Sequence, residues 1–196
     1  RVLFRSHAPT MAELRRLDPY GIFVTMGGQQ IVPDIPGIDR ENVFGIEDIL
    51  LGRRAIEGRE VAVIGGGHVG LEVAHFLCAN NQVTIVEMAD EIGASVYYIT
   101  KFKLLPMLRE AGVTFRTGQA IAAVDDGSIR LRDTHTGRYT ELKAEAVVLA
   151  MGSRPDLAAR AEFDRNFDRV VYAGDAVRGG TMLEANRDAF ALAWEF

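Results

Sequence analysis

The sequence predicts an α/β protein with a doubly wound parallel sheet and an antiparallel β-meander. Wholly apolar runs at Val61–Ile64 and Ala146–Met151 are typical of parallel strands that are covered on both faces. Such runs alternate with helical patterns, as doubly wound sheets require. Three segments of alternating polarity, separated by Asp126-Gly127 and Thr136-Gly137, predict the meander.

The other elements can be assigned in chain order from the same patterns. We expect helices over residues 10–17, 47–51, 68–80, 98–111 and 183–196, the fourth kinked or restarted at Pro106 because proline lacks a donor. Strands are predicted over residues 21–25, 60–64, 82–87, 113–116, 119–124, 128–132, 138–142, 146–151 and 170–173. The prolines and glycine of Ile31–Gly37 indicate a linker, and Asp156–Asp168 is expected to be irregular.

Composition excludes several functional classes. The net charge of -5 argues against a nucleic-acid surface, which needs clustered Lys and Arg. No apolar run approaches the ~20 residues of a membrane span, and no signal peptide is recognisable, so we expect a cytoplasmic protein. Cys78 is the only cysteine, which rules out an internal disulfide, a CxxC pair and a cluster held by four local thiolates. Any redox chemistry must therefore come from a bound cofactor, and no metal site is predicted.

The two ends of the chain suggest a fragment. Residues 1–6 resemble a translated adapter oligonucleotide, so we expect them to carry no function. The last predicted helix runs to Phe196 without a stop signal.

A glycine-rich run carries the clearest functional signal. Gly65, Gly66, Gly67 and Gly70 follow an apolar strand and open a helix, and a second strand ends at Glu87, 22 residues after Gly65. This context is what a Rossmann dinucleotide fingerprint requires. Gly65 would permit the tight turn, Gly67 would let a pyrophosphate approach the backbone, and Gly70 would let the helix pack closely on the sheet. The helix N-terminus would then attract the phosphates.

Glu87 bears on which dinucleotide binds. Its carboxylate is placed to accept hydrogen bonds from the adenosine ribose, and it would repel the 2′-phosphate of NADP. Met88-Ala-Asp-Glu91 supplies no Arg or Lys for that phosphate. We therefore expect NAD(H) in preference to NADP(H), although FAD shares the fingerprint.

The remaining candidates in this run have alternative interpretations. The candidate binding residues are His68, Val69, Glu72 and Met88, besides the four glycines and Glu87. His68 could contact phosphate or simply face solvent near the site. Glu72 could line the nicotinamide pocket, or it could be favoured only by the positive helix end. His75 and His135 are expected to be surface residues, and Cys78 a small buried hydrophobe.

Six motifs follow one another along the chain: Phe23-Val-Thr-Met-Gly-Gly28, Pro33-Asp-Ile-Pro-Gly37, Val63-Ile-Gly-Gly-Gly67, Val86-Glu-Met88, Val148-Leu-Ala-Met-Gly-Ser-Arg-Pro155 and Val171-Tyr-Ala-Gly-Asp175. In this order they resemble the C-terminal module of the old-yellow-enzyme-like NADH:flavin oxidoreductases, which include 2,4-dienoyl-CoA reductase, 2-enoate reductase and trimethylamine dehydrogenase. The resemblance covers nearly everything from Pro9 onward.

The resemblance implies an NAD(P)H-binding domain over residues 38–152, inserted into parts of an FAD-binding domain over residues 1–37 and 153–196. Cofactor contacts would come from Thr25, Gly27, Met151 and Gly152 at the crossovers, and from Gly174 and Asp175 at the flavin ribityl chain. The chain departs from the family in lacking the FAD domain's own GxGxxG. The upstream flavin-binding barrel of the same polypeptide, with its FMN and iron–sulfur cluster, is missing too.

Two functional hypotheses follow. The first is an electron-input module in which NADH passes hydride to FAD, with no catalytic side chain required, feeding the reduction of an activated C=C bond in the intact protein. The fragment alone is expected to be inactive. The second is a non-catalytic ADP-binding domain, as in trimethylamine dehydrogenase-like proteins. A thioredoxin-reductase-like enzyme is disfavoured because the redox CxxC is missing.

Overall fold

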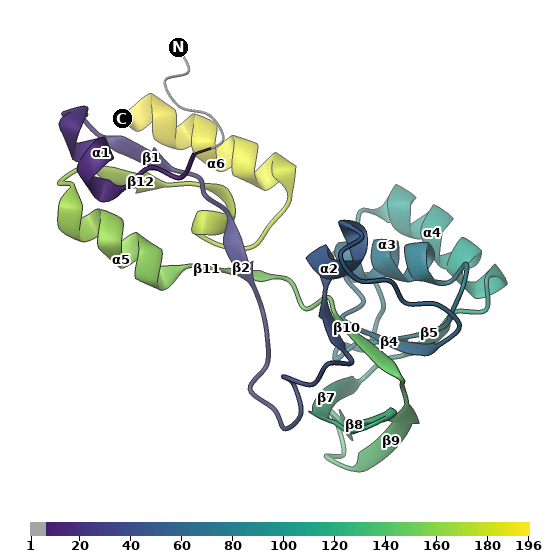
Figure 1. The fold of residues 1–196 in the computed structure, drawn as a ribbon. Helices are drawn as coiled ribbons and strands as arrows, with labels where there is room; N and C mark the ends of the chain where they lie inside the picture. Colours follow the sequence, from purple (N-terminus) through teal and green to yellow (C-terminus); the bar gives the residue numbers. More distant parts are fainter. Residues whose placement is uncertain (1–6) are drawn as a thin grey trace. The chain divides into compact units, whose positions relative to one another are not determined.

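The computed structural model describes residues 7–196, which form two compact units (Figure 1). One unit contains residues 7–29 together with Ser153–Phe196, and the other contains Gln30–Gly152. The expectation for residues 1–6 lies outside the described residues. Nearly all buried apolar side chains belong to the second unit, since among the described residues of the first only Val24, Ala173 and Ala176 are buried.

The second unit is built on a five-stranded parallel sheet in the order β3-β10-β4-β5-β6. Its strands are β3 (Val43–Gly45), β4 (Glu60–Ile64), β5 (Gln82–Val86), β6 (Thr114–Arg116) and β10 (Ala146–Leu149). Its helices are α2 (Ile46–Leu50), α3 (His68–Leu77) and α4 (Tyr98–Glu110). The predicted parallel sheet is thereby confirmed.

Alternation along the strands explains why the sheet is covered on both faces. Val61 and Val63 of β4 pack with the helices, in a cluster that includes Leu71 and Leu108. Ala62 and Ile64 of the same strand point the other way. They meet the meander of β7 (Gln119–Val124), β8 (Ser128–Asp133) and β9 (Tyr139–Lys143), which lies on the face opposite the helices (Figure 1).

The segment Ile31–Gly37 lacks regular structure, as predicted, but it is packed rather than free. Ile35 lies against the meander cluster, and the Val124 N–H donates to the Pro36 carbonyl at 2.9 Å. Gly37 has φ +79°, and a Cβ there would lie 1.9 Å from the Val124 carbonyl oxygen. The compact unit therefore begins at Gln30, because this segment supplies part of its apolar core.

The first unit contains a two-stranded parallel sheet of β1 (Ile22–Val24) and β12 (Val170–Tyr172). Its helices are α1 (Met11–Arg16), α5 (Leu157–Asn166), the 3₁₀ turn η1 (Gly174–Ala176) and α6 (Met182–Glu195). β2 (Gly28–Gln30) pairs with β11 (Ser153–Pro155) where the chain passes from one unit to the other and back. Thr10 and Thr181 cap α1 and α6 in reciprocal capping boxes with Glu13 and Glu184.

One sequence prediction is wrong. Asp156–Asp168 is not irregular, because it contains α5, whose first turn is capped by the Asp156 carboxylate accepting from the Ala159 N–H at 3.0 Å. The predicted helix around Pro106 is confirmed, because α4 runs from Tyr98 to Glu110 with the proline inside it, and of the two alternatives at the proline the restart is excluded.

Candidate functional site

The predicted glycine-rich turn lies where β4 ends and α3 begins. Gly65 has φ +110°, a conformation that side chains with a Cβ rarely adopt, and a Cβ there would lie 2.3 Å from the Ala150 carbonyl oxygen. At Gly70 a Cβ would lie 1.9 Å from the Gly65 carbonyl oxygen. Both glycines are therefore required by the close approach of α3, the turn and β10.

Gly67 differs from its neighbours, because a Cβ built on it would meet no atom within 4 Å. It is the N-cap of α3, and no side chain caps the helix there. The first-turn N–H groups of a helix have no partner within the helix, so this end offers donors and a positive dipole. Open space in front of such a helix end suits a phosphate group.

Glu87 is held beside this turn by two backbone donors. Its Oε2 accepts the Gly66 N–H at 2.7 Å, and its Oε1 accepts the Ala89 N–H at 2.9 Å. The side chain is half-buried. The carboxylate is thus fixed while lone pairs remain on both oxygens. Gly66 is buried, and its N–H is directed at Glu87.

The other candidates of the helix start are exposed. His68 Nε2 lies 3.6 Å from Glu72 Oε1, one turn along α3, and both side chains are about half exposed. Val69 and Met88 are exposed as well. The pairing of His68 with Glu72 favours neither a phosphate contact nor a purely structural role.

Met151 and Gly152 follow the carboxyl end of β10. Met151 packs partly against the meander cluster. Gly152 has φ +86° and is exposed, and its carbonyl accepts the Ile31 N–H at 2.9 Å. These two residues lie in the same unit as Gly65–Gly70 and Glu87.

The four remaining predicted residues lie in the other unit. Thr25 is exposed after β1, and Gly27 has φ +81°, with no atom within 4 Å of the place that a Cβ would take. Gly174 opens the turn η1 with φ +62°. Asp175 already has two partners, since its Oδ2 accepts the Ser153 hydroxyl at 2.9 Å and its Oδ1 accepts the Gly180 N–H at 3.2 Å.

A pairing of two polar residues near Glu87, His135 and Asp90, was not predicted from the sequence. His135 is exposed, as predicted, but its Nε2 lies 2.6 Å from Asp90 Oδ1, so it has an acidic partner 45 residues away in the chain. The sequence places His135 only in a predicted hairpin turn, and this placement does not indicate which residue lies next to it in space.

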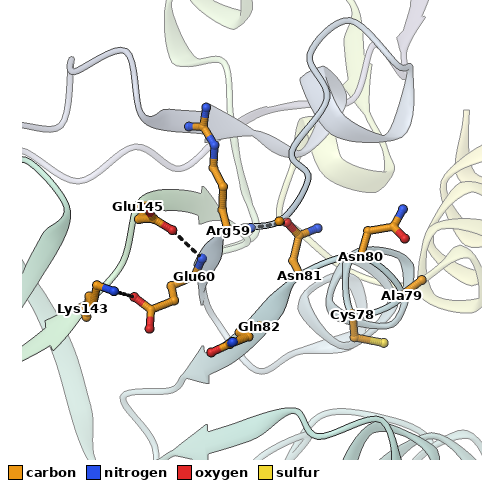
Figure 2. Close-up of a pocket in the computed structure, with 10 residues that line it drawn as sticks. Arg59, Glu60, Cys78, Ala79, Asn80, Asn81, Gln82, Lys143 and Glu145 are labelled. Carbon is orange, nitrogen blue, oxygen red and sulfur yellow. Dashed lines mark hydrogen bonds and ion pairs between the residues drawn. The ribbon is translucent and has the colours of Figure 1, made fainter.

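A pocket of about 470 Å³ lies at the opposite edge of the sheet, where β4 and β5 begin (Figure 2). Two of its charged side chains form an ion pair, with Lys143 Nζ 2.8 Å from Glu60 Oε2, and the Glu145 carboxylate accepts the Glu60 N–H at 3.0 Å. Five residues of strand separate this pocket from Gly65, or about 16 Å at about 3.3 Å per residue. The pocket is therefore not the site that the glycine-rich turn marks.

Other kinds of site find no support among residues 7–196. No three His, Cys, Asp or Glu side chains in this range are grouped so that they could hold a metal ion. None of the helices described is long and apolar enough to cross a membrane.

Comparison with known proteins gives the family. Residues 12–169 match the family described as pyridine nucleotide-disulphide oxidoreductase. The NADH oxidase of Thermoanaerobacter brockii is 32% identical over 186 residues, which are 91% of this chain and 28% of that protein. The cinnamate reductase of Clostridium sporogenes is 28% identical over 178 residues, or 88% of this chain and 26% of that protein. The chain thus spans only about a quarter of the length of these relatives.

Solved structures agree with the fold. The 6-hydroxypseudooxynicotine amine oxidase of Pseudomonas geniculata N1 superposes with a TM-score of 0.81 at 25% identity, covering 92% of this chain and 30% of that one. A 2-naphthoyl-CoA reductase gives a TM-score of 0.82 at 23% identity, covering 96% of this chain and 28% of that one. The predicted fold class and the predicted resemblance to the NADH:flavin oxidoreductase module are confirmed. The chain belongs to the pyridine nucleotide-disulphide oxidoreductase family.

Proposed function

We propose that the chain binds NADH at the carboxyl edge of its parallel sheet and is the electron-input module of a flavin-dependent oxidoreductase. One observation carries the proposal: the Glu87 carboxylate is fixed by two backbone N–H groups beside a glycine turn whose Gly67 leaves open space. When bound, the nicotinamide supplies a hydride and FAD accepts it.

The residues present suit the adenosine half of such a dinucleotide. The unpaired first-turn N–H groups of α3 would bind the pyrophosphate, and the free lone pairs of Glu87 would accept from the ribose hydroxyls. Met88, Ala89, Asp90 and Glu91 carry no positive charge to offset a 2′-phosphate, which supports NADH over NADPH. The chain's contribution is positioning and electrostatics, so no side chain acts as an acid or base.

The rest of the proposal concerns the intact protein. Residues 38–152 would be the NAD(P)H-binding domain, and residues 1–37 and 153–196 would be parts of an FAD-binding domain in which Gly174 and Asp175 approach the ribityl chain. Electrons would pass to an upstream barrel carrying FMN and an iron–sulfur cluster, and from there to an activated C=C bond. The similarity to a cinnamate reductase supports this acceptor. A cytoplasmic location is part of the same proposal.

A non-catalytic ADP-binding domain is the alternative. It is favoured by the fact that the open space at Gly67 and the fixed carboxylate of Glu87 both address the ADP half. Nothing in these two features requires a nicotinamide.

Calorimetric titration of the chain with NADH, NADPH and ADP separates the two functions. Tighter binding of NADH than of the other two supports the electron-input module. Equal affinity for ADP and NADH supports the ADP-binding domain. If none of the three binds to the folded chain, both functions are wrong.

A further inference from the structure

The loop that carries Glu87 is held by hydrogen bonds that involve two other turns of the same unit, the turn after β6 and the turn between β8 and β9. On one side, the Glu87 N–H donates to the Arg116 carbonyl at 2.8 Å, and the Gly118 N–H donates to the Ala89 carbonyl at 2.9 Å. On the far side of Gly118, its carbonyl accepts both the N–H of Thr134, at 2.8 Å, and the Thr134 hydroxyl, at 3.0 Å. The turn between β8 and β9 is thus hydrogen-bonded to the turn after β6, and that turn is hydrogen-bonded to the Glu87 loop.

A direct link closes this arrangement. His135 Nε2 lies 2.6 Å from Asp90 Oδ1, so the β8–β9 turn holds the Glu87 loop without an intermediary. Among the residues that the structure describes, this is the only side-chain-to-side-chain hydrogen bond or ion pair between residues 87–91 and the meander. Asp90 lies three residues after Glu87, and the intervening Ala89 N–H is one of the two donors that fix the Glu87 carboxylate.

The charges around the imidazole favour its protonated form. Asp90 faces it from the loop after β5, and Asp133 adds a second negative charge from the end of β8. Gly118 lies beside the ring, since a Cβ built there would be 3.5 Å from it, but brings no charge. The hydrogen bond to Asp90, helped by the attraction of Asp90 and Asp133, raises the pKa of His135 above its usual range. The Asp90–His135 bond therefore has its charged form at low pH and weakens as the pH rises through this pKa.

We propose that Asp90 and His135 are positioning residues that hold the ribose-binding carboxylate of Glu87 in place, so that adenosine dinucleotides bind more tightly when His135 is protonated. The inference rests on the proposed dinucleotide site and deepens it. Both side chains are exposed, so the pair is an ordinary surface ion pair in strength. We expect a two- to fivefold change in affinity, which is about what such a pair supplies.

The test measures the dissociation constants of ADP and NADH across the range from about pH 5 to pH 8, where histidine titrates. For the unmodified chain we expect both constants to rise two- to fivefold as His135 loses its proton. His135→Gln and Asp90→Asn should bind like the unmodified chain at high pH and should lack this rise. His75→Gln, a change at an exposed histidine on α3, should keep it.

Two further controls separate this proposal from others. His68, which pairs with Glu72 at the start of α3, is the same in the unmodified chain and in His135→Gln, so only the difference between these two proteins reports the role of His135. Reduced nicotinamide mononucleotide lacks the adenosine ribose, and its binding should not respond to either substitution. Circular dichroism of each variant shows whether it is folded.

The outcomes distinguish the two levels of inference. If ADP and NADH bind and His135→Gln keeps the full pH dependence, the proposed positioning role of Asp90 and His135 is wrong, while the dinucleotide site stands. The same holds if Asp90→Asn keeps it. If the folded, unmodified chain binds neither ADP nor NADH, the proposed dinucleotide site is wrong, and so is the positioning role of Asp90 and His135 that depends on it.

Discussion

Replacing Glu87 by glutamine removes the negative charge that we expect to set the choice between NADH and NADPH. The carboxylate accepts one backbone N–H on each oxygen, at 2.7 Å from Gly66 and 2.9 Å from Ala89. Glutamine has nearly the same shape but presents an NH₂ group to one of these donors. The variant thus keeps the packing of the loop while losing one of the two hydrogen bonds and the charge.

The size of the selectivity change follows from the repulsion that is removed. Two like unit charges about 4 Å apart repel by about 1 kcal/mol in bulk water and by about 4 kcal/mol at an effective dielectric constant of about 20. Glu87 is half-buried, so its repulsion of a 2′-phosphate lies between these limits. In Glu87→Gln the ratio of the NADPH to the NADH dissociation constant should therefore decrease by a factor of between about five and several hundred. NADH itself should bind more weakly, since a ribose acceptor is lost.

Calorimetric titration of the unmodified chain and of Glu87→Gln with both dinucleotides measures this ratio. Glu91→Gln is the matched control, because Glu91 is an exposed carboxylate four residues on that pairs with Lys101. Its ratio should stay that of the unmodified chain. A folded Glu87→Gln protein with an unchanged ratio would refute the assignment of Glu87 to the ribose.

Three further outcomes follow from the same structure. Gly65→Ala should lower the free energy of unfolding, measured in urea, by at least about 2 kcal/mol, because its Cβ would lie 2.3 Å from the Ala150 carbonyl oxygen and the backbone conformation is strained. Gly67→Ala has open space around the new Cβ, so it should lower this free energy by under about 1 kcal/mol while weakening NADH binding. Leu131→Ala, fully buried under the sheet, should cost about 2–5 kcal/mol in the same assay, and an unchanged midpoint would contradict the packing of the meander. Burial, with a hydrogen bond to Asp164, raises the pKa of Tyr172 to about 12. The neutral side chain therefore stabilises the fold below pH 10, and this part of the free energy of unfolding is lost as the pH rises towards 12. When the free energy of unfolding is measured against pH, Tyr172→Phe should lack this loss.

Local signals in the sequence were sufficient where the interacting residues are close in the chain. The β4–turn–α3 unit, the meander turns and the capped helix α1 all rest on patterns within about twenty residues. Helix α5 was not predicted, although its N-cap Asp156 and the helix-favouring run after it are visible in the sequence, because its apolar residues give no clear periodicity and none is buried. The helix across Pro106 was predicted correctly from its pattern, since α4 accommodates the proline without ending.

Pairings between distant segments could not be predicted in this way. The three-residue strands β2, β3 and β11 are too short to show a period, and each is defined by a partner far along the chain, such as β2 by β11. The same reason hid the bond between Asp90 and His135. Likewise, the sequence could not show that Asp175 already accepts from Ser153 and Gly180.

By itself, the sequence determined the class of fold and the position of the dinucleotide fingerprint, because glycine spacing, apolar runs and the acidic residue after the second strand act locally. Only the tertiary structure decided which atoms surround that fingerprint. It directs the Gly66 N–H at Glu87, leaves the space at Gly67 open and brings His135 to Asp90. These relations depend on how the sheet, the helix and the meander pack against one another, and packing between segments far apart in the chain leaves no periodic trace in the sequence.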